Sequence, residues 1–85
     1  MKHRAHPNFW AAYRKLSADV QAVADRNFVL LKNDPRHPSL RLKKTGDYWS
    51  ARVGLDHGAL AIEADVGLLW TWIGADDEYE RLIGS

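Results

Sequence analysis

The residues best suited to chemistry lie in two segments of alternating apolar and polar side chains, 40–44 and 48–54, separated by Thr45-Gly46-Asp47. This pattern around a glycine turn predicts a β-hairpin, whose successive side chains point to opposite faces. One face then carries three cations and an aromatic ring, from Arg41, Lys43, Arg52 and Tyr48. Such a surface can bind the phosphates and bases of RNA. Lys44, at the end of the first segment, is a further candidate RNA-binding residue.

Metal-independent cleavage of RNA needs a base for the 2′-hydroxyl, cations for the phosphate and an acid for the leaving oxygen. Arg52 is the main candidate cation, because its strand is flanked on both sides and a charge there needs a partner or a ligand. His37 has a side chain suited to proton transfer. The other candidate catalytic residues are Asp56, Asp76 and Tyr79.

Each of these residues also has a purely structural interpretation. The cationic face can be a solvated sheet surface whose charges guard an edge strand. A lone loop histidine such as His37 more often caps a turn, and the same holds for His57 beside Asp56. Acids at 76–78 most often begin a helix, and Tyr79 is more often a packing residue.

Composition limits the classes of protein to consider. The chain has 85 residues and no Cys, which predicts one domain without disulfides or a thiolate zinc site. No apolar run approaches the roughly 20 residues that cross a bilayer, and the first residues lack the apolar stretch of a signal peptide. We therefore expect a cytoplasmic protein with no membrane partner, no cofactor and no metal. Residues 1–7 are expected to form a flexible tail.

Charge is distributed unevenly along the chain. Residues 1–44 carry ten Lys and Arg against three Asp, a net charge of +7, whereas residues 45–85 carry two Arg against eight acids, a net charge of −6. The basic half is compatible with a phosphate-binding surface. It is equally compatible with a domain whose two halves attract each other.

Apolar periodicity predicts the elements that position these residues. Positions recurring every three to four residues predict a helix from Pro7 or Asn8 to near Leu16. Ser17 is a suitable N-cap for a second helix that Asp34-Pro35 would end. Period-two patterns then predict strands at 40–44, 48–54, 58–64 and 68–73, turns at 45–47, 55–57 and 65–67, and a final helix at 76–83.

Short connections between the strands favour antiparallel neighbours. The expected fold class is α+β: an N-terminal αα-hairpin packed on a small, mainly antiparallel sheet of three to four strands, with a short C-terminal helix. All of it forms one domain.

Three segments carry a family resemblance: Asp34-Pro-Arg-His-Pro-Ser-Leu40, Tyr48-Trp-Ser-Ala-Arg-Val-Gly54 and Trp72-Ile-Gly-Ala-Asp-Asp-Glu-Tyr79. In this order the chain resembles the RelE/ParE-like toxin superfamily of bacterial type II toxin–antitoxin systems, from Phe9 onward. The resemblance implies a toxin that cleaves mRNA at the ribosome, without metal, and that a cognate antitoxin neutralises. The alternatives are a catalytically degenerate interaction protein, a member that binds DNA gyrase, or an independent RNA-binding module.

The resemblance also implies roles for single residues and reveals two departures. His37 matches a histidine of some nuclease members, Arg52 lies where they place a basic or imidazole side chain, and Asp56 falls near a position that is acidic in some. Relatives often have Arg where this chain has Gly58, and many have His where it has Asp76. We expect weak cleavage, because each such group commonly contributes on the order of 10² in rate. The family's opening strand is not evident before the first helix.

Overall fold

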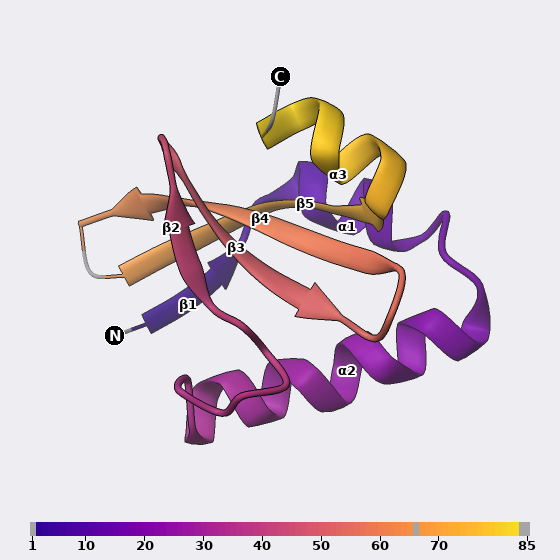
Figure 1. Ribbon diagram of the computed structural model, residues 1–85, viewed down its shortest axis with the longest axis horizontal. Coiled ribbons are helices and arrows are strands. Elements are labelled where there is room, and N and C mark those ends of the chain that lie inside the picture. Colours follow the sequence, from indigo (N-terminus) through magenta and orange to yellow (C-terminus); the bar gives the residue numbers. More distant parts are fainter. Residues whose placement is uncertain (1, 66, 84–85) are drawn as a thin grey trace.

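The computed structural model describes residues 2–65 and 67–83 and is shown in Figure 1. Its elements in chain order are β1 (Lys2–Ala5), α1 (Pro7–Tyr13), α2 (Ala18–Asn33), β2 (Lys43–Thr45), β3 (Tyr48–Val53), β4 (His57–Ala64), β5 (Gly67–Ala75) and α3 (Asp76–Ile83). The strands form one five-stranded sheet in the order β1-β5-β4-β3-β2. All neighbouring strands are antiparallel except β1, which is parallel to β5. The predicted α+β class, with a helix pair and a short C-terminal helix, is confirmed.

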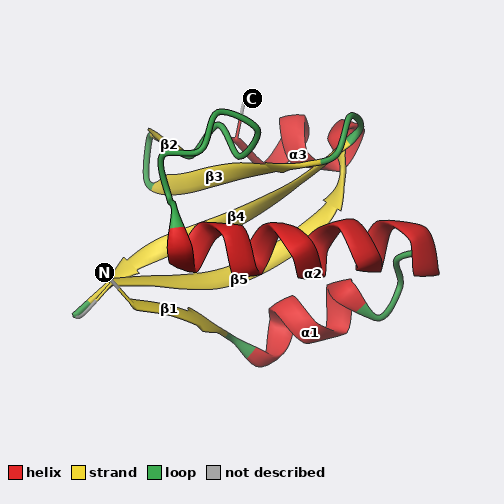
Figure 2. Ribbon diagram, turned by 90° about the horizontal axis from the view of Figure 1, so that it is seen from below, coloured by secondary structure: helices red, strands yellow, loops and turns green. Residues whose placement is uncertain are grey.

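The helices cover the two faces of the sheet unequally. Figure 2 shows α2 lying across one face with α1 beside it, and Figure 1 shows α3 on the other side of the sheet. Local signals explain the ends of α2. The backbone N–H of Val20 donates to the Ser17 hydroxyl over 3.3 Å, and the helix stops at Asn33, before Asp34-Pro35. Proline disfavours helical conformation at the residue that precedes it.

The hydrophobic core lies between the sheet and the α1/α2 pair. Its buried members are Ala24, Leu31, Leu40, Ala51, Val53, Ala59, Ala61, Leu68, Trp70 and Ile73. In β3, Ala51 and Val53 point into this core while Arg52, between them, points to the α3 side, as alternation requires. We call these the helix-pair face and the α3 face of the sheet.

The expected flexible tail at residues 1–7 is wrong for the residues that the structure describes. Lys2–Ala5 forms β1, at the edge of the sheet, and pairs with Gly67–Trp70 of β5. The indole N–H of Trp70 donates to Nδ1 of His3 over 3.1 Å, and the N–H of His6 donates to the Trp70 carbonyl over 2.8 Å. Pairing satisfies backbone groups at the outer edge of β5, which is the physical reason for the strand. Met1 lies outside the described residues.

With β1 the sheet has five strands, whereas three to four were expected. Gly67 permits the close approach, because a Cβ at this position would collide with the backbone of Lys2. A strand before the first helix, not evident in the sequence, is thus present. The predicted turn at residues 65–67 includes Val66, which lies outside the described residues.

The first strand of the hairpin is shorter than predicted. β2 begins at Lys43 rather than Leu40, because Arg41 has a left-handed backbone with φ of 46° and interrupts the strand. The N–H of Arg52 still donates to the Leu40 carbonyl over 2.7 Å. Leu40 is buried in the core and Leu42 packs against it, so the predicted apolar side of this segment is retained. None of the helices in the described ranges is long and apolar enough to cross a membrane.

Candidate functional site

Arg52 is the centre of the polar cluster on the α3 face. Its Nη1 donates to Oδ1 of Asp76 over 2.8 Å, and its Nη2 donates to Oδ2 over 2.9 Å. The two side chains are 27% and 31% exposed, so this ion pair is partly desolvated. The hydrogen bonds lower the pKa of Asp76 and raise the pKa of Arg52, because each charge stabilises the other. Both groups are therefore ionised at neutral pH.

Two further contacts orient the guanidinium. Nη2 of Arg52 also donates to the Leu55 carbonyl over 2.9 Å, and the guanidinium carbon lies 5.9 Å from the centroid of the Tyr79 ring. The backbone N–H of Asp76 donates to the Asp56 carbonyl over 3.0 Å. The β3–β4 turn and the start of α3 are thus tied together around Arg52.

Tyr79 occupies the space above Gly58. A Cβ on Gly58 would lie 2.6 Å from Cδ1 of Tyr79, and the tyrosine is buried. Gly58 pairs with Arg52 across β3 and β4. Gly58, where the resembled relatives often have arginine, is therefore matched by Tyr79, whose ring fills the volume that a larger side chain would need.

The predicted catalytic set is brought together only in part. Arg52, Asp76 and Tyr79 meet at one place, and Asp56 joins them through its backbone carbonyl. The carboxylate of Asp56 instead lies 2.9 Å from Nδ1 of His57. Sequence reasoning left His57 outside the candidate set, although its position next to Asp56 in a turn was the available signal.

His37 belongs to a separate turn. The N–H of Ser39 donates to Nδ1 of His37 over 3.2 Å, and the Ser39 hydroxyl lies 2.8 Å from the same nitrogen. No hydrogen bond or ion pair within residues 2–65 and 67–83 links His37 to the Arg52 cluster. The structural interpretation of His37 as a turn cap is the one that these contacts support.

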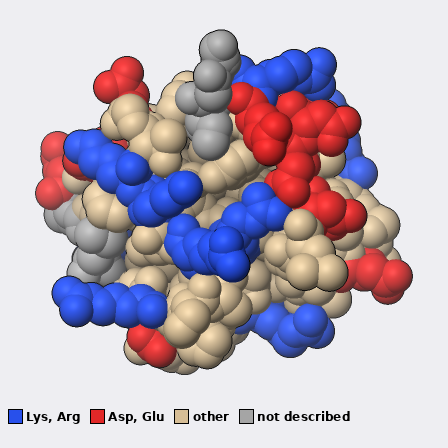
Figure 3. Space-filling model, in the orientation of Figure 1, with Lys and Arg blue, Asp and Glu red and all other residues tan. Residues whose placement is uncertain are grey.

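The hairpin cations divide between the two faces. Lys43 pairs with Ser50, so it shares the α3 face with Arg52 and half-buried Tyr48. Lys44 points the opposite way and lies 3.0 Å from a carboxylate oxygen of Glu63. Arg41 is exposed just before β2. Figure 3 shows Lys and Arg gathered across the middle of the visible surface, with carboxylates beside them.

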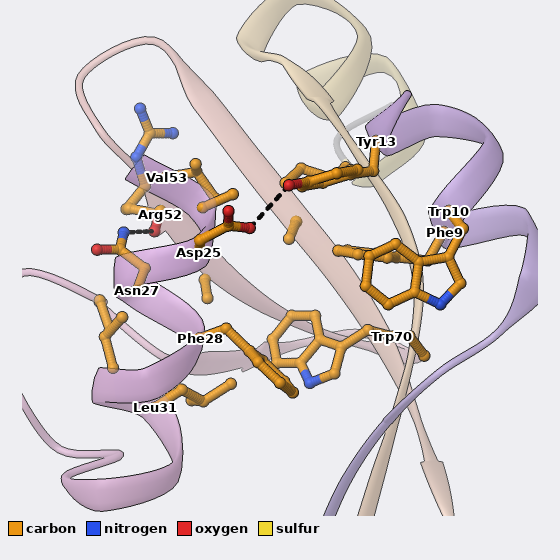
Figure 4. A pocket seen from close by; sticks show the side chains of 16 residues that line it. Phe9, Trp10, Tyr13, Asp25, Asn27, Phe28, Leu31, Arg52, Val53 and Trp70 are labelled. Carbon is orange, nitrogen blue, oxygen red and sulfur yellow. Dashed lines mark hydrogen bonds between the residues drawn. The ribbon is translucent and has the colours of Figure 1, made fainter. Parts of the chain in front are cut away.

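A second feature, on the helix-pair face, is an apolar pocket of about 80 Å³ between α1, α2 and the sheet. Figure 4 shows its aromatic lining and the hydrogen bond, 2.8 Å long, from the Tyr13 hydroxyl to Asp25. Trp10 and Phe28, both lining residues, are 44% and 39% exposed. The sequence pattern did not predict this pocket.

Comparison of the sequence with protein-family models and with curated proteins gives no match. Among solved structures, the RelB-RelE antitoxin-toxin complex from Methanococcus jannaschii is similar with a TM-score of 0.72 and 11% identity, over 93% of this chain and 96% of that one. The isolated Escherichia coli RelE toxin has a TM-score of 0.62 and 13% identity, over 94% of this chain and 96% of that one. A copper-bound mutant toxin from Helicobacter pylori has a TM-score of 0.62 and 16% identity, over 92% of this chain and 97% of that one. More than nine-tenths of this chain therefore shares the fold of these RelE-like toxins.

Proposed function

We propose that this protein is the toxin component of a type II toxin–antitoxin system, that it acts on mRNA at the ribosome, and that a cognate antitoxin neutralises it. The observation that carries the proposal is the similarity, over 93% of this chain, to a structure that contains a RelE toxin together with its RelB antitoxin. Fold alone does not define activity, so the proposal also needs a suitable surface.

The α3 face supplies such a surface. Lys43 and Arg52 are cations on neighbouring strands of this face, and Tyr48 adds an aromatic ring. Lysine and arginine bind backbone phosphates, and an aromatic ring can stack on an exposed base. We assign RNA binding to this face, with exposed Arg41 as a further contact, and we leave Lys44 out because it pairs with Glu63 on the other side.

Cleavage makes stricter demands than binding. Arg52 is the cation best placed to stabilise a crowded phosphate, while Asp76 and Tyr79 are the groups nearest to it that can exchange protons. The carboxylate of Asp76, with its lowered pKa, is a base rather than an acid at neutral pH. We therefore expect cleavage to be slow and to depend on Arg52.

The test is expression of the protein without its antitoxin, followed by growth measurement and mapping of transcript ends. We expect slowed growth and new transcript ends, and both should disappear in Arg52→Ala. Circular dichroism of the purified variant checks that it is folded. Unaltered growth together with intact transcripts would contradict the proposal.

Two adjacent lysines provide a matched test of the RNA-binding face. Lys43→Ala and Lys44→Ala remove the same charge from the same strand, but only Lys43 lies on the α3 face. We expect Lys43→Ala to weaken binding of a fluorescent single-stranded RNA and to reduce its salt dependence, with little change for Lys44→Ala. Equal effects of the two variants would indicate non-specific attraction.

A second candidate function is that of a catalytically degenerate toxin that still binds an antitoxin. The observation in its favour is the full engagement of Arg52 by Asp76 and by the Leu55 carbonyl. Cleavage of mRNA on ribosomes by the unmodified protein would exclude it. If the target is gyrase, the alternative implied by the resemblance, the purified protein should instead inhibit DNA supercoiling while transcripts stay intact.

A further inference from the structure

We propose that Asp76 is an internal substitute for the phosphate that Arg52 binds, so that the carboxylate keeps the site closed until a nucleic-acid phosphate displaces it. This inference rests on the proposed function, because it takes RNA as the ligand. It adds a form of regulation that is built into the chain itself.

The geometry of the contact supports the substitution. Both terminal nitrogens of Arg52 donate to the two oxygens of one carboxylate, over 2.8 Å and 2.9 Å. This parallel pair of hydrogen bonds is the arrangement in which arginine also binds phosphate, because both anions present two oxygens to the planar guanidinium. Asp76 therefore occupies the position that a phosphate on this side of Arg52 would take.

The guanidinium would stay oriented after the carboxylate leaves. The hydrogen bond from Nη2 to the Leu55 carbonyl and the contact with the Tyr79 ring do not involve the Asp76 side chain. The backbone bond from Asp76 N–H to the Asp56 carbonyl is likewise independent of it. Exchange of carboxylate for phosphate thus requires rotation of one side chain, while α3 remains docked through Tyr79 on Gly58.

Charge around the site explains why the closed state is favoured without RNA. Asp76 stays ionised at neutral pH because Arg52 lowers its pKa, so protonation does not release the arginine. Asp77 and Glu78 follow in the first turn of α3 and repel an approaching phosphate. Lys43 on the same face attracts the neighbouring phosphates of the RNA and offsets part of that repulsion.

The experiment compares Asp76→Asn with Asp77→Asn. Both variants remove one negative charge from the first turn of α3, but of these two carboxylates only that of Asp76 hydrogen-bonds to Arg52 in the structure. With a fluorescent single-stranded RNA, we expect Asp76→Asn to bind about tenfold more tightly than the natural protein. The slope of log affinity against log salt should steepen by up to about 0.7, because the phosphate no longer exchanges with a charged carboxylate on Arg52. Asp77→Asn should change affinity less than about threefold.

Arg52 must be the source of this gain. When Asp76→Asn is added to Arg52→Gln, RNA affinity should rise by no more than it does when Asp77→Asn is added to the natural protein. Thermal unfolding of each variant shows whether it is folded, and Asp76→Ala provides a second way to remove the carboxylate. Equal RNA affinities of Asp76→Asn and Asp77→Asn would overturn the inference and leave the proposed function standing.

Inorganic phosphate gives a probe that does not depend on RNA. Its binding can be followed by NMR through the side-chain Nε–H signal of Arg52. We expect this signal to shift at lower phosphate concentration in Asp76→Asn than in Asp77→Asn or the natural protein. A phosphate gain without RNA binding would support Asp76 as a substitute for a bound phosphate but contradict RNA as the ligand and the proposed function, whereas equal phosphate titrations of all three proteins would overturn the inference.

Discussion

The helix-pair face and the α3 face belong to the same sheet, yet they are covered in different ways. On the helix-pair face, Trp70 and Ile73 are 4% and 3% exposed and contribute to an apolar core under α1 and α2. On the α3 face, one short helix is joined to the sheet by the Arg52–Asp76 ion pair and by Tyr79 on Gly58. The first face contains most of the apolar burial, and the second contains the partly desolvated Arg52–Asp76 ion pair.

One strand contributes both to the apolar core and to the ion pair on the opposite face. Along β3, Ala51 and Val53 enter the core while Arg52 points to the α3 side, because successive side chains alternate. Core side chains contribute stability through buried area. A partly exposed ion pair contributes less, because water solvates its charges and exchanges with its hydrogen bonds. We therefore expect substitutions on the helix-pair face to affect mainly folding and those at Arg52 mainly ligand binding.

The largest effect should come from Trp70→Ala. It removes a buried aromatic from the helix-pair face and the indole donor that holds His3 of β1. We expect a loss of about 3–5 kcal/mol in the free energy of unfolding, measured by urea denaturation. Trp10→Ala is the control, because Trp10 is 44% exposed and Trp70 only 4%, so its removal should have a smaller effect. Similar losses for both would break the contrast between core and surface on this face.

The second test addresses packing on the α3 face. Gly58→Ala places a methyl group 2.6 Å from Cδ1 of Tyr79, so the ring must move. We expect a loss of about 1–3 kcal/mol in the free energy of unfolding. In a Tyr79→Ala background the same change should cost much less, because the obstructing ring is gone. Equal costs in both backgrounds would mean that Tyr79 does not restrict Gly58.

The Gly58 result also changes the expectation for an arginine at this position. In the sequence, Gly58 stands where relatives of the resembled superfamily often have arginine. The structure places Tyr79 in that space, so Gly58→Arg must first displace a buried ring. Sequence comparison with a motif detects the missing side chain, but it does not reveal which other residue fills the volume.

Local patterns predicted the faces of the hairpin well. The alternation of Tyr48 and Arg52 with Ala51 and Val53 follows from strand stereochemistry alone, and the structure confirms it. The cap of α2 at Ser17 and its end before Asp34-Pro35 are likewise local, and both are confirmed. Short-range rules were sufficient for these features.

Long-range pairings were the features that the sequence did not reveal. The residues Lys2–Ala5 are mostly polar and show no strand pattern, and they become β1 only because β5 offers a partner. Arg52 and Asp76 were both named as candidates, yet their ion pair depends on how β3, β4 and β5 align before α3 begins. His37 lacked such a pairing and remains a turn residue.

A smaller effect is expected at the mouth of the apolar pocket. Tyr13→Phe removes the hydroxyl that donates to Asp25 over 2.8 Å and joins α1 to α2. We expect a loss of at most about 1 kcal/mol, because this hydrogen bond is exposed to water. Above pH 10 the difference between the two proteins should vanish as Tyr13 ionises with a raised pKa, caused mainly by its bond to Asp25. A loss as large as that of Trp70→Ala would mean that the helix pair depends on polar contacts rather than on burial.

The smallest effect should be a pH dependence at the edge of the helix-pair face. Burial is the main cause of the lowered pKa of His3, whose Nδ1 accepts the indole N–H of Trp70 over 3.1 Å. The unfolded chain therefore binds a proton more readily than the folded one. The contribution of His3 to stability is complete above about pH 6.5, its unfolded pKa, and is lost as the pH falls through the folded value.

Comparison with His3→Asn isolates this contribution, because asparagine keeps an acceptor near Nδ1 but does not titrate. The other histidines are the same in both proteins. We expect the free energy of unfolding, measured in urea between pH 7.5 and pH 5, to fall slightly more in the natural protein than in His3→Asn. Parallel curves would show that protonation of His3 does not weaken the attachment of β1. Because a protonated Nδ1 cannot accept the indole N–H, that result would mean that the backbone pairing of β1 with β5, and not this hydrogen bond, holds the strand in place.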